Sequence, residues 1–154
     1  MQFLRLSNNQ PKPPTYEQDF YLWTSYTASL LKERRFDELD LSSLVEEIET
    51  LGRSEKHTVQ SNLIIVLLHL LKYKYQPERR TNSWLASIAE HRDRLDIVLA
   101  DSPSLKSFVN EAFTNCYEKA RRRTAIETEL PIATFPATSP FTPEEALDPD
   151  YLPQ

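Results

Sequence analysis

The chain has 154 residues, a net charge of −5, one glycine and one cysteine, and this length buries a single core without disulfides. The lone Gly52 excludes glycine-rich loops that cradle dinucleotides or phosphates, and one cysteine excludes an intrachain disulfide. The polar N-terminus MQFLRLSNNQ is too short for a signal peptide and no apolar run is long enough to span a membrane, so we expect a cytoplasmic protein without a membrane partner.

The first predicted helix spans about residues 16–34. Residues 1–14 before it end in QPKPP, and prolines at this place predict a flexible N-terminal arm. Thr15 begins a capping box with a glutamine three residues later, and apolar residues recur at helical spacing from Phe20 onward.

A second helix and a separate central helix are predicted next. Asp40 or Ser42 would cap the second helix, and Gly52 suits the left-handed position after its end. Ser54 would then cap the central helix. The segment NLIIVLLHLLKYKY at 62–75 is apolar on every face, so we expect the central helix to be buried within an all-helical domain.

Two further helices follow in the pattern. The fourth helix carries apolar residues over 84–99 and would be capped by Asn82 or Ser83. The fifth spans about residues 103–129, with Ser102 as its cap and a proline at its first position.

The last segment, residues 131–154, contains six of the eleven prolines and cannot be regular except for one turn after Thr142. Its large apolar side chains are too many for a solvated linker and predict an extended strap docked in grooves of the bundle: Ile132, Phe135, Phe141, Leu147 and Tyr151. We therefore expect one all-α domain over residues 15–154, a bundle of about five helices with a proline-rich C-terminal strap.

Seven segments carry a family resemblance over residues 15–152: YEQDFYLW at 16–23, LVEEIETLGRSE at 44–55, LLHLLKYKYQP at 67–77, SWLASIAEHR at 83–92, DSPSL at 101–105, TELPIATFP at 128–136 and SPFTPEEALD at 139–148. Their order resembles the bacterial family named domain of unknown function 29. The resemblance implies an all-α helical bundle and no established activity.

One candidate for chemistry joins His69 of the central helix to a glutamate of the second helix. Glu47 and Glu49 flank the buried face of that helix and Glu46 points to solvent, so at most one of them reaches the histidine. Such a pair is a general base or the start of a metal site, with Arg92 as a basic neighbour. Because metal-ligand spacing is absent, we expect no metal and no cofactor, and we favour a structural histidine.

A second candidate is a basic set interleaved with tyrosines: Lys72, Lys74, Arg79, Arg80, Arg121, Arg122 and Arg123. Cations beside aromatic rings bind phosphates and stack on bases, which predicts a nucleic-acid surface. Two alternatives stay open. The cations complement the negative end of the central helix, or the acidic residues after position 123 lie across them and neutralise them.

These patterns favour an interaction protein over an enzyme, either a homo-oligomer or a partner of another protein through aromatic helix faces. The alternative is an enzyme or nucleic-acid-associated factor that uses His69, Glu47 or Glu49 and the basic set. An enzyme requires these groups to converge in a concave pocket, whereas an interaction protein requires an exposed apolar surface.

Overall fold

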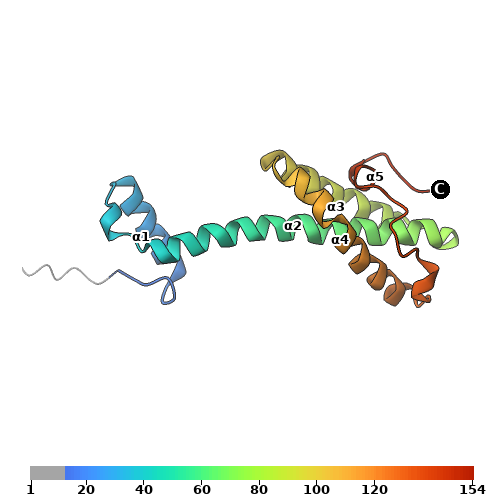
Figure 1. The fold of residues 1–154 in the computed structure, drawn as a ribbon, viewed down its shortest axis with the longest axis horizontal. Coiled ribbons are helices and arrows are strands. Elements are labelled where there is room, and N and C mark those ends of the chain that lie inside the picture. The colour runs from blue at the N-terminus through green and yellow to red at the C-terminus, as the bar shows by residue number, and fades with distance from the viewer. Residues whose placement is uncertain (1–12) are drawn as a thin grey trace, which may run out of the picture. The chain divides into compact units, whose positions relative to one another are not determined.

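A computed structural model, which describes residues 13–154, confirms the predicted all-α fold with five α-helices (Figure 1). The helices are α1 (Phe20–Lys32), α2 (Leu41–Tyr75), α3 (Asn82–Asp101), α4 (Leu105–Thr128) and α5 (Pro143–Leu147), and no strand occurs within these described residues. Short 3₁₀ helices lie between them: η1 (Phe36–Glu38), η2 (Pro77–Arg79) and η3 (Ile132–Thr134). The predicted arm falls mostly on residues 1–12, outside the described part of the chain.

The chain divides into two compact units, Met1–Thr50 and Leu51–Gln154, which share α2. In the first unit α1 begins at Phe20 rather than at the predicted residue 16. Its cap is Asp19, whose Oδ1 accepts the backbone N–H of Leu22 at 2.9 Å. Thr15 instead takes part in a turn that precedes the helix. That residues 15–154 form one domain stays a prediction.

The predicted break at Gly52 is wrong, because α2 runs continuously from Leu41 to Tyr75. Asp40 caps it, as one of the two alternatives predicted, through a 3.2 Å hydrogen bond from the backbone N–H of Ser43. Gly52 does not adopt the left-handed conformation of a helix end. A single glycine costs a helix about 1 kcal/mol, and continuous hydrogen bonding on both sides outweighs that cost.

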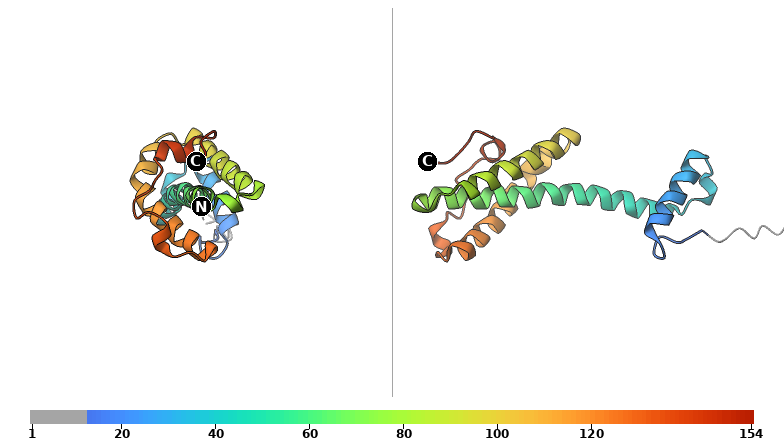
Figure 2. Two further views of the ribbon diagram at one scale, coloured as in Figure 1. Left: turned by 90° about the vertical axis from the view of Figure 1, so that its right-hand side faces the viewer. Right: turned by 180° about the vertical axis from the view of Figure 1, so that it is seen from behind.

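The second unit is built around the C-terminal half of α2, against which α3 and α4 both pack (Figures 1 and 2). Six α2 side chains are fully buried there: Val59, Leu63, Val66, Leu67, Leu70 and Leu71. The predicted buried central helix is therefore confirmed. No helix among residues 13–154 is long and apolar enough to cross a membrane.

The caps of α3 and α4 differ from the predicted ones. Thr81, rather than Asn82 or Ser83, accepts the backbone N–H of Trp84 through its hydroxyl oxygen at 3.3 Å. The turn that contains Ser102 precedes α4, which begins two residues later than predicted, at Leu105. Each cap is thus displaced by a few residues, since several neighbouring polar side chains could serve.

The C-terminal strap, residues 131–154, docks on the second unit as predicted. Phe135 and Phe141 are buried, and the Phe135 ring meets Tyr75 edge-on at 5.5 Å between centroids. Thr142 opens the single helical turn α5 with a complete capping box. Ile132 departs from the prediction, because 44% of it remains exposed.

Replacing Gly52 with alanine tests the continuity of α2. No atom lies within 4 Å of the Cβ that alanine would add, so Gly52→Ala should raise the free energy of unfolding by about 0.5–1 kcal/mol. Urea denaturation measures this. Ser54→Ala is the companion variant, since removal of a true N-cap costs about 1 kcal/mol and removal from a helix interior does not. Loss of stability in both variants would favour two separate helices.

Candidate functional sites

Glu47 and His69, two members of the predicted glutamate–histidine pairing, have different hydrogen-bond partners. Glu47 belongs to the first unit, where its Oε2 accepts the hydroxyl of Tyr16 at 2.9 Å. This hydrogen bond to an acidic group raises the pKa of Tyr16. His69 belongs to the second unit, where its Nδ1 lies 3.0 Å from the carbonyl oxygen of Ile65. A catalytic role for Glu47, Glu49 or His69 stays a prediction.

A polar seam between α2 and α3 contains two of the three histidines. The Nδ1 of His91 lies 2.6 Å from the side-chain oxygen of Asn62, whose amide nitrogen donates to the carbonyl of Thr58 at 2.8 Å. Since Asn62 presents its oxygen to the ring, His91 donates from Nδ1. This buried network fixes how α3 sits along α2.

Burial lowers the pKa of both seam histidines. For His69 the hydrogen bond to Ile65 opposes this effect, and the nearby Lys72 cation adds to it. For His91 the positive charges of Arg94 and His69 add to the effect of burial. Across residues 13–154 no group of three or more His, Cys, Asp or Glu side chains could hold a metal ion.

The basic set is divided among several partners. Lys72 pairs with Glu127 at 3.2 Å and lies over the ring of Trp84, and Arg80 lies over Tyr73 and donates to its carbonyl. Arg121 donates to backbone carbonyls of the strap. Lys74 is half-buried, and Arg79, Arg122 and Arg123 are exposed. Contact of the basic set with phosphate stays a prediction. The Lys72–Glu127 pair is the kind of contact that neutralisation by acidic residues after position 123 requires.

Arg92 holds the strap through a buried guanidinium group. This side chain of α3 is 4% exposed and donates to three backbone carbonyls: Nε to Ala146 at 2.9 Å, Nη1 to Tyr151 at 2.9 Å and Nη2 to Glu145 at 3.0 Å. Burial lowers its pKa, and the negative charge of Asp148 opposes that shift. The charge is thus compensated by carbonyl dipoles, and Arg92 acts here as a structural clamp.

Two α4 side chains hold the earlier part of the strap in the same way. Arg121 donates to the carbonyls of Phe135 at 2.9 Å and Ile132 at 3.1 Å. The hydroxyl of Tyr117 donates to the carbonyl of Pro136 at 2.6 Å, and burial raises the pKa of Tyr117 to about 12. Sequence reasoning missed these clamps, because a backbone carbonyl acceptor leaves no signature in the residue types.

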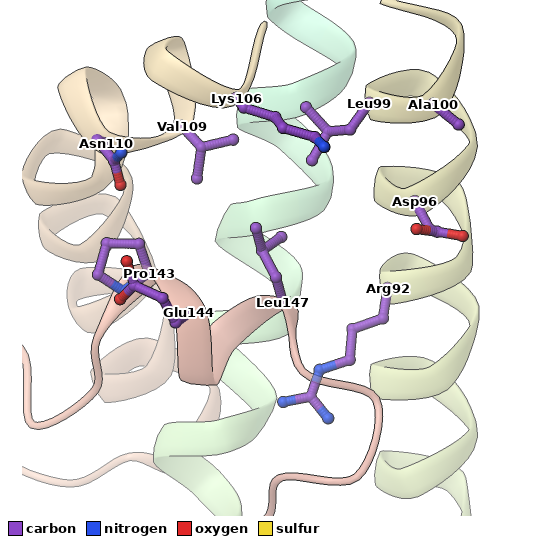
Figure 3. Close-up of a pocket in the computed structure, with 10 residues that line it drawn as sticks. All are labelled: Arg92, Asp96, Leu99, Ala100, Lys106, Val109, Asn110, Pro143, Glu144 and Leu147. Atoms are coloured by element: carbon purple, nitrogen blue, oxygen red, sulfur yellow. The ribbon is translucent and has the colours of Figure 1, made fainter. Parts of the chain in front are cut away.

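A pocket of about 380 Å³ lies beside Arg92, between α3, α4 and α5 (Figure 3). Its walls combine apolar, charged and amide side chains: Arg92, Asp96, Leu99, Ala100, Lys106, Val109, Asn110, Pro143, Glu144 and Leu147. Of these residues the sequence singled out Arg92 as a functional candidate. The others come from three separate segments, which only the tertiary structure brings together.

A second unusual surface lies on the first unit. Eight of the twelve exposed large apolar side chains within residues 13–154 belong to it: Phe20, Tyr21, Leu22, Leu31, Phe36, Leu41, Val45 and Ile48. We call these eight residues the apolar surface. Its presence matches the kind of surface that an interaction protein requires.

Comparison with known proteins gives one match. A family model described as "Domain of unknown function DUF29" matches residues 15–152, a span that includes all five helices. This is the family that the seven sequence segments resemble. Neither the curated proteins nor the solved structures contain a match to the chain.

Acidification should destabilise the protein through the seam histidines. A histidine whose pKa is lower in the folded state than its ordinary value of about 6.5 stabilises the fold above that pH and loses this contribution as the pH falls below it. Urea denaturation at pH values from about 8 to 5 measures this effect. Between these pH values the free energy of unfolding should fall less in the His69→Gln, His91→Gln double variant than in the wild type. His57→Gln, at an exposed position of α2, is the control and should match the wild type. Equal losses in all three proteins would contradict the prediction.

Replacing Arg92 with lysine should release the end of the strap. Lysine keeps the charge but cannot fork across three carbonyls, so buried acceptors lose partners and the variant should lose about 2–4 kcal/mol of unfolding free energy. Limited proteolysis should also cut the strap faster. The control is Arg94→Lys, whose exposed pair with Glu90 contributes about 0.5 kcal/mol or less. If the free energy of unfolding falls by the same small amount in both variants, Arg92 is not a clamp.

Proposed function

This chain belongs to the DUF29 family, and we propose that it functions as a cytoplasmic helical module that associates with a second copy of itself through the apolar surface of its first unit. The observation that carries the proposal is the exposure of eight large apolar side chains in that unit. Each of them is 42–78% exposed. Exposed large apolar side chains in this number are unusual for a solvated unit and favour a protein interface.

The first unit buries too little to be stable alone. Its buried side chains within residues 13–50 are Trp23, Thr27 and Leu30. Tyr16 adds edge-on ring contacts to Phe20 at 5.5 Å and to Trp23 at 5.0 Å. The unit spans Met1–Thr50, close to the roughly 40 residues below which a domain usually needs a disulfide, a metal or oligomerisation. The lone cysteine of the chain lies in the other unit.

The exposed area is large enough for a stable dimer. An aromatic side chain carries roughly 150–250 Å² of surface, and a leucine, isoleucine or valine side chain carries somewhat less. With about half of that exposed on each of eight residues, the apolar surface offers on the order of 800 Å², which is what one partner contributes to a standard protein interface. Much of the burial that the unit lacks would thus be supplied by one partner molecule.

The spacing on α2 supports a second copy as the partner. Leu41, Val45 and Ile48 recur at intervals of four and three residues, the spacing of a helix seam that packs against another helix. Leucine and β-branched residues on such a seam interlock with a seam of the same kind. A two-fold symmetric contact uses the same surface on both molecules, and this surface satisfies that requirement.

A charge on the seam should dissociate the dimer. Light scattering coupled to size exclusion should give about twice the monomer mass of 18.0 kDa for the wild type. Ile48→Asp places a carboxylate where a side chain is 60% exposed, so it should leave the monomer fold intact and lower the affinity at least tenfold, because an unpaired charge would be buried on association.

The matched control for this experiment is Ile126→Asp. Ile126 is 77% exposed on α4 of the second unit, so the same substitution at that position should leave the mass of the dimer unchanged. A wild-type protein that remains a monomer at every concentration tested would refute the proposal. Equal weakening by both variants would refute the assignment of the interface.

A further inference from the structure

The pocket between α3, α4 and α5 has the dimensions of a small-molecule site. Its volume of about 380 Å³ falls within the range of roughly 300–1,000 Å³ that ligand pockets occupy. One wall consists of Arg92, Asp96 and Leu99, which are spaced by four and three residues and so lie on one face of α3. Another wall contains Lys106 and Asn110, which are four residues apart on α4. The wall residues therefore come from firmly packed helices rather than from loops.

Apolar side chains and the buried Arg92 form the inner part of the pocket, and exposed polar side chains form the outer part. Leu99 and Val109 are 6% and 1% exposed, and Leu147 joins them from α5 (Figure 3). Asp96, Lys106, Asn110 and Glu144 are exposed around them. A ligand that fills this pocket must combine a compact apolar part with polar groups at one end.

The charges of the lining decide the class of that polar end. Two cations and two anions line the pocket, Arg92 with Lys106 and Asp96 with Glu144, so the lining has no net charge. A ligand with a single charge would meet like charges as well as opposite ones. A ligand with one cationic and one anionic group is complementary to both, and a small neutral zwitterion is the simplest molecule of that kind.

We propose that this pocket binds a free α-amino acid with an aliphatic side chain. The side chain packs on Leu99, Val109 and Leu147, and the carboxylate accepts hydrogen bonds from Lys106 and the amide of Asn110, which lie one helical turn apart on α4. Lys106 reaches across the pocket mouth toward Leu99 (Figure 3). The ammonium group donates to Asp96 of α3. Arg92 serves this site by fixing α5, since its three hydrogen bonds to strap carbonyls hold that wall in place.

Leucine and two analogues that each lack one charge test this assignment on the full-length protein. Isothermal titration should show saturable binding of L-leucine, with at least tenfold weaker binding of 4-methylpentanoate, which lacks the ammonium group, and of 3-methylbutylamine, which lacks the carboxylate. No saturable binding of L-leucine in the millimolar range would overturn the proposal. Equal affinity for all three compounds would also overturn it, because an apolar patch alone would then explain the binding.

Two variants and one control locate the bound molecule. Lys106→Met and Asp96→Asn change exposed side chains, so both proteins should fold, and each should weaken L-leucine binding at least tenfold. Lys119→Met changes another exposed lysine of α4, outside the pocket, and should bind as the wild type does. Binding that Lys106→Met and Asp96→Asn leave unchanged would place the ligand elsewhere and overturn the proposal. The dimer surface uses other residues, so either proposal can fail without the other.

Discussion

Burial of the C-terminal half of α2 is the constraint on which the second unit depends. This stretch presents apolar side chains in every direction, so no single neighbour can cover it. α3 and α4 each cover part of it, and the strap completes the enclosure with Phe135 and Phe141. The strap is therefore part of the core, even though most of it lacks regular secondary structure.

A strap without regular structure leaves its backbone carbonyls in need of partners, because burial without a hydrogen bond is costly. Arg92, Arg121 and Tyr117 meet this need from α3 and α4. Apolar rings thus provide the burial, and three polar side chains fix where the strap lies. The same arrangement shapes the pocket proposed for an amino acid, since α5 forms one of its walls.

The two units differ in how well their apolar side chains are covered. The second unit encloses a large core, whereas the first unit buries few side chains and exposes eight large ones. Exposure of these apolar side chains to water is unfavourable in free energy, and association with a second copy would remove much of their surface from solvent. We therefore connect the proposed function with the first unit and the proposed ligand with the second.

The sequence by itself determined the all-α class, the buried central helix and the docking of the strap, because these follow from local periodicity, proline positions and apolar content. It misjudged Gly52, since a glycine signals a helix end only where no hydrogen bonding continues past it. Only the tertiary structure decided that Arg92 clamps the strap, that His91 of α3 pairs with Asn62 of α2, and which three segments form the pocket. Each of these depends on contacts between residues distant in the chain, and neither residue type nor spacing records such contacts.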